Sequence, residues 1–334
     1  ISALLIIVLL IVGFLAWRMK GPDRSYRVSL DLPKAGAPAP GVLEVGVAKV
    51  DITPDLSQYD QWTDANDDGK YKESDGDTWT DTNGNGKRDL VWMAGFSDNR
   101  PAKGVNDPLW ARAIAFRNND VTVAMVTIDS IGILAEKFIA VRKSIDPSLN
   151  IDHVMFSTLH NHETPDTMGI WSNMDGVGAI LFKSNFDYAY MAKVQKACKE
   201  AVEEAVRGLQ PADMTIAEEE IKPEGFVDDS RDPQVFDLKV CSARFTKHGT
   251  DQTIATMISW GNHVETLGSS NSLLTSDFPH YLREGLEKGV GEPNGVEKFG
   301  GMALYFQGMV GGLMTQLHTT VPHRDGQQKF EKAS

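Results

Sequence analysis

Two histidines separated by a single residue, His160 and His162, follow a short apolar run at residues 154–156. Side chains two positions apart in an extended segment point to the same side, so these two imidazoles can converge on one point. A neutral imidazole is the commonest metal ligand in proteins and is one of the groups that Zn²⁺ prefers. The pair therefore indicates a metal site, with two surface histidines in a polar loop as the alternative.

A second part of the chain repeats this arrangement. His263 follows a β-type run at residues 253–260 and is expected in an exposed loop at the end of that strand. Open α/β proteins carry their chemistry just beyond the carboxyl ends of strands. Two strand ends that both carry histidine favour a metal site over unrelated surface histidines.

A third stretch predicts bound cations of another kind, because residues 51–89 contain eleven acidic and four basic side chains. Residues 64–69 (Asp-Ala-Asn-Asp-Asp-Gly) and 81–86 (Asp-Thr-Asn-Gly-Asn-Gly) place oxygen ligands at alternate positions before a glycine that permits a sharp turn. No amphipathic helices flank them, so we interpret both as structural calcium loops in an irregular insert, residues 55–92. A cluster of solvated turns is the alternative. The predicted calcium ligands are Asp64, Asn66, Asp68, Asp75, Asp81, Asn83, Asn85 and Asp89.

Charge and composition restrict the function class. The 334-residue chain has a formal net charge of −13, which argues against nucleic acid as a partner. Its hydrophobic content of 41% suits a globular body of one large or two moderate domains. Two cysteines, Cys198 and Cys241, could form one disulfide or none, so they say little about the compartment.

The amino terminus indicates a membrane segment. Residues 1–17 carry no charge and are followed by Arg18 and Lys20. About 17–25 apolar residues span a bilayer, so residues 1–20 are predicted to be a transmembrane anchor or a signal segment. No small-residue cleavage site follows directly, which favours an uncleaved anchor, and residues 21–42 are predicted to be a linker. Arg18 and Lys20 alone argue for a cytoplasmic body, whereas the calcium-like loops favour an extracytoplasmic one, periplasmic or on the cell surface.

Apolar periodicity and turn residues predict the elements that position the histidines. A hairpin at 109–129, a helix at 134–145 and the strand at 153–156 imply a βαβ unit with a parallel strand pair. A long helix, 188–209, has apolar residues every four positions and needs a sheet to cover. Further strands are predicted at 213–219, 235–245, 253–260 and 302–306, with a helix at 278–288. The predicted fold class is α/β, with a mixed, partly parallel β-sheet core flanked by helices.

Several segments, in their order along the chain, resemble the amino-terminal domain of the neutral/alkaline (non-lysosomal) ceramidase family and its bacterial relatives. They are 47–54 (Val-Ala-Lys-Val-Asp-Ile-Thr-Pro), 94–96 (Ala-Gly-Phe), 104–113 (Gly-Val-Asn-Asp-Pro-Leu-Trp-Ala-Arg-Ala), 158–166 (Thr-Leu-His-Asn-His-Glu-Thr-Pro-Asp), and His263 with Thr266, Asn271 and Asp277. Segment 158–166 is similar to the family's Thr-His-Thr-His-Ser-Gly-Pro, and His263 to its His-Pro-Thr segment. The resemblance covers about residues 45–320 and is specific for the family rather than for ceramide.

The resemblance implies roles for the histidines. His160 and His263 would bind zinc, and His162 would assist catalysis beside the metal. It also implies that further zinc ligands, a Glu and a Tyr, lie downstream of this sequence. Residues 43–334 are therefore expected to form a ceramidase-like α/β metal-hydrolase domain that is truncated at its carboxyl end.

The sequence also departs from the family pattern. Met314 stands where the family has its serine nucleophile, and Thr315 is the nearest hydroxyl, one position away. Glu163 replaces the Ser of the His-Thr-His-Ser segment, and Val264 replaces the Pro of His-Pro-Thr. These departures weigh against ceramide itself as the substrate.

The resulting hypothesis is a membrane-anchored, zinc-dependent hydrolase of an amide or ester bond in a small-molecule or lipid substrate. His162 and Thr315 are its candidate catalytic side chains, zinc its catalytic metal and calcium a structural one. The alternative is a catalytically degenerate cell-surface binding or structural module on the same fold.

Overall fold

A computed structural model describes residues 5–6, 8–10, 12–14, 39, 41–171, 186–291 and 295–315 of the protein. The chain divides into two compact units, Ile1–Pro40 and Gly41–Ser334. Most of the predicted anchor (1–20) and linker (21–42) lies outside the described residues. In the described part of the chain, no helix has both the length and the apolar character needed to cross a membrane.

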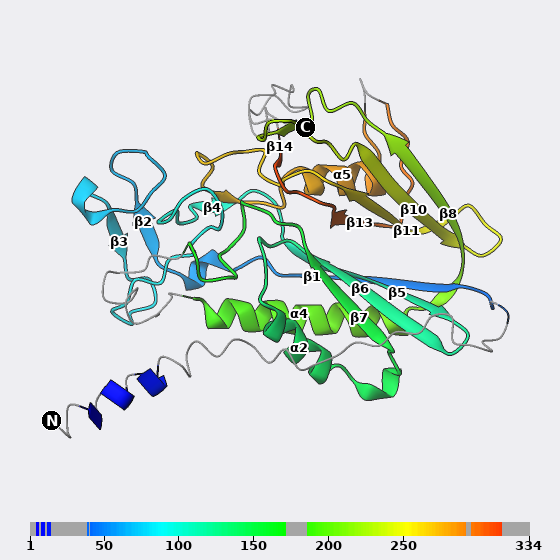
Figure 1. Ribbon diagram of the computed structural model, residues 1–334, viewed down its shortest axis with the longest axis horizontal. Coiled ribbons are helices and arrows are strands. Elements are labelled where there is room, and N and C mark those ends of the chain that lie inside the picture. The colour runs from blue at the N-terminus through cyan, green and yellow to red at the C-terminus, as the bar shows by residue number, and fades with distance from the viewer. Residues whose placement is uncertain are drawn as a thin grey trace. The chain divides into compact units, whose positions relative to one another are not determined.

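The second unit is built on one large sheet. Its strands are β1 (Glu44–Asp51), β5 (Trp110–Asn118), β6 (Val121–Ile128), β7 (His153–Thr158), β8 (Gln210–Glu220), β10 (Lys239–Lys247), β11 (Thr253–Trp260) and β13 (Met302–Gln307). They form an eight-stranded sheet in the order β13-β11-β10-β8-β1-β5-β6-β7 (Figure 1). β6 pairs in parallel with β7, and β11 with β13, whereas the other neighbours are antiparallel. The predicted mixed, partly parallel sheet is therefore confirmed.

The sheet curves so that strands of its two edges contact each other. β13, at one edge, contacts β6 and β7 at the other edge. The Thr127 hydroxyl on β6 donates to the backbone oxygen of Tyr305 at 2.6 Å, and Arg112 Nη1 on β5 donates to that of Ala303 at 2.8 Å. This contact between the edges allows residues that follow β7 to meet residues that follow β11.

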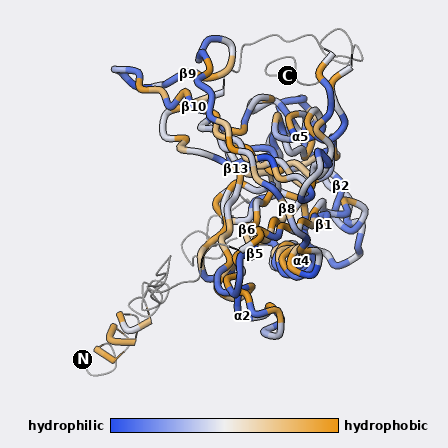
Figure 2. Tube along the Cα trace, turned by 90° about the vertical axis from the view of Figure 1, so that its right-hand side faces the viewer, coloured by the Kyte–Doolittle hydropathy of each residue, from blue (hydrophilic) through white to orange (hydrophobic). Residues whose placement is uncertain are grey.

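Within the described residues, the helices that cover the sheet are α2 (Ala135–Ser144), α4 (Tyr188–Arg207) and α5 (Phe278–Lys288). Helix α4 begins where Asp187 accepts a hydrogen bond from Tyr190 N at 2.8 Å, and its apolar stripe is buried against β1, β5 and β6. Figure 2 shows the apolar residues of β5 and β6 beside this helix. Helix α2 connects β6 to β7, and α5 packs on β13 (Figure 1).

β1 and α4 approach each other most closely at Gly46. A Cβ atom at this position would overlap the backbone oxygen of Ala205 and lie 2.8 Å from Leu209 N. Only glycine lets the helix lie this close to the strand, because any larger residue would push the two apart.

The predicted strand at 235–245 begins later than expected. β10 starts only at Lys239, because Val235 N donates to the Asp229 carboxylate at 2.7 Å instead of joining the sheet. The remaining short elements are β2 (Gln61–Thr63) paired with β3 (Thr78–Thr80), β4 (Gly104–Val105) with β12 (Leu273–Leu274), β9 (Val227–Asp229) with β14 (Leu313–Thr315), and the 3₁₀ turns Leu56–Gln58, Glu73–Asp75 and Pro147–Leu149.

The acidic insert contains an internal repeat that pairs with itself. Residues 60–64 (Asp-Gln-Trp-Thr-Asp) and 77–81 (Asp-Thr-Trp-Thr-Asp) include β2 and β3 respectively. These strands are antiparallel with Trp62 opposite Trp79, so equivalent residues of the two copies face each other. The insert therefore has a local pseudo-twofold arrangement, with one calcium-like loop after each strand.

The first aspartate of each copy, Asp60 or Asp77, accepts two backbone hydrogen bonds from the loop of the other copy. The donors are Thr82 N (2.9 Å) and Asp89 N (2.7 Å) for Asp60, and Ala65 N (2.8 Å) and Lys72 N (2.7 Å) for Asp77. Both side chains are buried. Each loop is thus held by an acid of the opposite copy, and the sequence pattern of the loops alone had not indicated either residue.

Candidate metal centre

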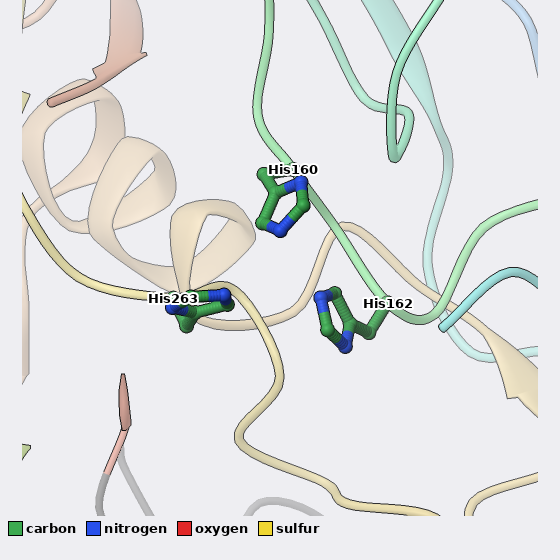
Figure 3. A group of neighbouring side chains, drawn as sticks. All are labelled: His160, His162 and His263. Atoms are coloured by element: carbon green, nitrogen blue, oxygen red, sulfur yellow. The ribbon is translucent and has the colours of Figure 1, made fainter. Parts of the chain in front are cut away.

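Two loops bring three histidines together. His160 and His162 follow β7, and His263 follows β11 (Figure 3). The loops pair with each other, because His162 N donates to the backbone oxygen of Val264 at 2.9 Å and Asn161 forms a parallel bridge with Val264. Backbone pairing alone therefore brings the two histidine-bearing loops together.

The three rings surround a common space, as Figure 3 shows. One ring nitrogen from each histidine lies within 4.8 Å of those of the other two. Ring centroids are 5.0 Å apart for His160 and His162, 4.9 Å for His160 and His263, and 5.5 Å for His162 and His263. Among the His, Cys, Asp and Glu side chains of the described residues, these three histidines form a group that is close enough to hold a metal ion.

Backbone carbonyls orient two of the rings. His160 Nδ1 lies 3.2 Å from the backbone oxygen of Ile131, and His263 Nδ1 lies 2.7 Å from that of Leu313. A carbonyl only accepts hydrogen bonds, so each Nδ1 is the donor to its carbonyl and each Nε2 is the ring nitrogen that remains for a metal. His160 also has a φ of 57°, a left-handed conformation that turns its ring into the site.

His263 is less exposed than the sequence suggested. We expected an exposed loop residue, but its side chain is buried because strand β14 and the loop after β7 cover it. Its substitution therefore removes a buried hydrogen bond to Leu313 as well as an imidazole.

His162 differs from its two neighbours. Neither of its buried ring nitrogens has a hydrogen-bond partner among the described residues. Burial, and then the positive charges of the neighbouring His160, His263 and Arg100, lower the pKa of His162 to about 3. Burial and His263 also lower the pKa of His160. These rings are therefore neutral at physiological pH, which is the form that binds metal.

The unpartnered nitrogens and the set of donors fit a bound transition metal. Imidazole is a preferred ligand of Zn²⁺, Cu²⁺, Fe²⁺ and Ni²⁺. A buried polar nitrogen without a partner is costly, and coordination would remove that cost.

Gly95 and Phe96 pack tightly against His162. A Cβ atom on Gly95 would lie 2.6 Å from the Cβ of His162, and Gly95 has a φ of 79°. The Phe96 ring meets the His162 ring edge to face, with centroids 5.1 Å apart. Segment 94–96, which belongs to the family resemblance, is therefore a wall of the site.

A buried ion pair lies next to the histidines. Arg100 Nη2 donates to the backbone oxygens of His162 and of Ala94, the latter at 2.7 Å, and lies 3.4 Å from Glu163 Oε2. Asn271 Nδ2 donates to the same carboxylate oxygen at 2.8 Å. Burial raises the pKa of Glu163 well above its usual value, and Arg100 opposes this change. Glu163 had been identified in the sequence as a departure from the family pattern, whereas no local pattern had indicated that Arg100 lies beside the histidines.

Two further buried acids lie nearby. Glu265 Oε2 is 3.2 Å from His162 Nδ1, and burial, with Asp277 next in effect, raises the pKa of Glu265 to about 7. Asp277 caps α5 and accepts a hydrogen bond from the Thr266 hydroxyl at 2.6 Å. Burial raises the pKa of Asp277 to about 6.

Thr315 lies beside the main chain of His263 rather than beside a histidine ring. Its buried hydroxyl donates to the backbone oxygen of His263 and lies 3.2 Å from Asn262 Oδ1. Met314, its neighbour on β14, is partly buried. Catalysis by Thr315 stays a prediction.

The predicted calcium ligands form two similar turns. Asp64 accepts hydrogen bonds from Asp68 N and Gly69 N, and Asp81 accepts the equivalent bonds from Asn85 N and Gly86 N. The other predicted ligands also bond within the insert: Asn66 with Asp68, Asp75 with Lys72, and Asn83 and Asn85 with Asp89. Calcium binding by these loops stays a prediction.

Comparison with known proteins shows a ceramidase-like fold. No protein-family model and no curated protein sequence matches the chain. The neutral ceramidase from Pseudomonas aeruginosa matches with a TM-score of 0.57 and 18% identity, over 82% of this chain and 39% of that one. A ceramidase complexed with C2 matches with a TM-score of 0.59 and 17% identity, over 84% and 39%. This chain thus spans about two fifths of the length of those ceramidases.

Proposed function

We propose that the chain is part of a zinc-dependent hydrolase of an amide or ester bond. The observation that carries this proposal is the meeting of three imidazoles at the ends of β7 and β11. The ceramidase-like fold supports it, since both similar structures are ceramidases. We propose a small molecule or a lipid as the substrate.

His160 and His263 would hold the ion through Nε2, because their Nδ1 atoms are bonded to backbone carbonyls. When bound, zinc polarises a carbonyl group and lowers the pKa of a water ligand to about 7. The Arg100 guanidinium keeps a positive charge beside the loop that carries His162. Gly95 and Phe96 pack against His162 and hold its ring in place.

The proposal also includes the layout of the chain. Residues 1–20 would attach the protein to a membrane, residues 21–42 would act as a linker, and residues 43–334 would form the extracytoplasmic hydrolase domain. Calcium in the loops of the insert would have a structural role, because it would neutralise the acidic side chains gathered there.

A second candidate is a binding or structural module without catalytic activity. Met314 supports it, because this side chain has no nucleophilic atom where the family has serine. The Thr315 hydroxyl, which donates to the His263 backbone, supports it as well.

Zinc content and hydrolysis together separate these candidates. We expect the purified full-length protein to contain about one zinc ion per chain. His160→Ala and His263→Ala should each abolish that zinc, whereas His248→Ala, a substitution of an exposed histidine on the β10–β11 turn, should retain it. His263→Ala should cost about 1 kcal/mol of stability through the lost hydrogen bond to Leu313.

The enzyme should also hydrolyse acyl amides or p-nitrophenyl esters, lose this activity to a chelator and regain it with zinc. Full zinc retention by both His160→Ala and His263→Ala would exclude the metal centre. Bound zinc without hydrolysis of any ester or amide would favour the binding module.

A further inference from the structure

Each of the three imidazoles has an acceptor near Nδ1. For His160 and His263 the acceptor is a backbone carbonyl, at 3.2 and 2.7 Å. For His162 it is the side chain of Glu265, whose Oε2 lies 3.2 Å from Nδ1. The angle between His162 Nδ1 and Glu265 Oε2 is unsuitable for a hydrogen bond, so both His162 ring nitrogens lack a hydrogen-bond partner among the described residues.

We propose that His162 is a third metal ligand, through Nε2, and that Glu265 is the positioning residue that holds it in that role. The inference rests on the proposed metal centre and concerns its ligand set. It differs from the role that the family resemblance implies for His162, which is assistance beside the metal.

The backbone places Glu265 where this role requires it. His162 N donates to the Val264 backbone oxygen at 2.9 Å, so the residue after Val264 lies alongside the His162 ring. The Glu265 side chain is 1% exposed, and Oε1 has no hydrogen-bond partner within the described ranges. A buried carboxylate with spare acceptor capacity is the group that commonly orients a metal-bound histidine.

The same arrangement explains why the His162 ring is the one with unpartnered nitrogens. Its Nδ1 lies 3.2 Å from Glu265 Oε2, and its ring centroid lies 5.0 Å from that of His160 and 5.5 Å from that of His263. A rotation of the ring that aligns Nδ1–H with Glu265 Oε2 directs Nε2 away from Glu265. His160, His162 and His263 would then each offer one ring nitrogen to the same ion.

Zinc affinity of the full-length protein, measured by competition with a chromophoric chelator, tests the proposal. His162→Ala should lower the affinity at least about 100-fold, and Glu265→Gln should lower it about 10- to 100-fold, the range found when partners of ligand histidines are changed. Glu203→Gln is the matched control, because Glu203 is also a buried glutamate but lies on α4 and bonds Asp146 N. Its zinc affinity should equal that of the wild type.

X-ray absorption of the zinc-loaded wild type gives a count of ligands that needs no variant. We expect three imidazoles in the wild type and two in any zinc that His162→Ala still binds. Two imidazoles in the wild type would overturn this inference and leave the metal centre intact. The same conclusion would follow if His162→Ala kept wild-type zinc affinity while His160→Ala and His263→Ala bound no zinc. Wild-type affinity in Glu265→Gln would exclude the role of Glu265. Zinc retention in all three histidine variants would instead reject the metal centre itself.

Discussion

Single residues around His162 decide how its ring is held. Gly95 combines a φ of 79° with direct contact to the His162 side chain, so a larger residue meets two obstacles there. Phe96 meets the edge of the same ring and also lies under the Arg100 guanidinium, 5.1 Å from its carbon. The wall formed by these residues therefore fixes the position of the His162 ring.

Gly95→Ala should destabilise the protein by roughly 1 kcal/mol or more, because alanine is strained at positive φ. It should also weaken zinc binding, because the added methyl displaces His162. Gly249→Ala is the control, since Gly249 has a φ of 70° with no neighbour within 4 Å of an added Cβ. Chelator competition and thermal melting measure both effects. Equal zinc affinity in Gly95→Ala and the wild type would show that this contact does not position the ligand.

Thr315 is the residue that could replace the missing serine nucleophile. Its hydroxyl is buried and donates to the His263 backbone, so we expect a structural role. Thr315→Val should retain most hydrolytic activity and lose about 1–3 kcal/mol of stability, because a buried acceptor is left unpaired. His162→Ala should lose about two to four orders of magnitude in rate.

Rates from initial-velocity assays and unfolding curves in urea measure these effects, with Thr315→Ser as the control that keeps a hydroxyl. If Thr315→Val is as inactive as His162→Ala while zinc stays bound, threonine is the nucleophile. That outcome would mean that hydrolysis proceeds through a covalent intermediate on Thr315.

Among the elements, α5 is joined to the sheet by a fully buried ion pair. Arg283 on α5 donates through Nη1 and Nη2 to the two carboxylate oxygens of Asp129, at 2.8 and 3.0 Å. Both side chains are 1% exposed. Asp129 follows β6 and also accepts hydrogen bonds from Trp110 N and the Ser276 hydroxyl.

Arg283→Ala should destabilise the protein by about 3–5 kcal/mol, because it leaves Asp129 buried without its cation. Arg207→Ala is the matched control: Arg207 is about half exposed and pairs with Glu203 on the same helix. This pair is worth only about 0–1 kcal/mol. Urea unfolding measures both losses. A loss below about 1 kcal/mol for Arg283→Ala would mean that the buried pair does not fix α5.

The paired loops of the insert form the element for which calcium is predicted. We expect calcium to raise the melting temperature by mass action, because it would bind only the folded loops. Asp64→Ala and Asp81→Ala should each weaken this response, since each removes the first predicted ligand of one loop. Asp251→Ala, at an exposed aspartate between β10 and β11, should leave it unchanged. A melting temperature that neither calcium nor chelator alters would identify the loops as ordinary turns.

The whole molecule depends on contact between the two edges of one sheet. β13 contacts β6 and β7, and the buried Thr127 hydroxyl on β6 donates to the backbone oxygen of Tyr305 on β13. The two parallel strand pairs, β6–β7 and β11–β13, therefore lie next to each other. The histidines follow one strand of each pair.

The full-length chain should be recovered with membranes if residues 1–20 form the proposed anchor. A chain that begins at Val42 should be recovered in the soluble fraction with an unchanged melting temperature, because Gly41–Ser334 is a compact unit by itself. Fractionation by ultracentrifugation and thermal melting measure this. Recovery of both forms in the soluble fraction would reject the anchor.

The sequence by itself determined the main elements. The hairpin at 109–129, the following helix and the strand before His160 were predicted from local periodicity and turn residues, and they correspond to β5, β6, α2 and β7. The stripe of α4 and the partly parallel sheet were also predicted. These features depend on interactions between residues close in the chain, so a short stretch of sequence contains their signal.

Only the tertiary structure decided which side chains surround the histidines. The contact between the sheet edges places His263 within reach of His160 and His162, and it buries His263, which the sequence had suggested to be exposed. Arg100 and Glu265 acquire their positions beside His162 in the same way. Such contacts join residues far apart in the chain. Their geometry follows from strand order and loop pairing, and a local pattern of residue types does not specify either of these.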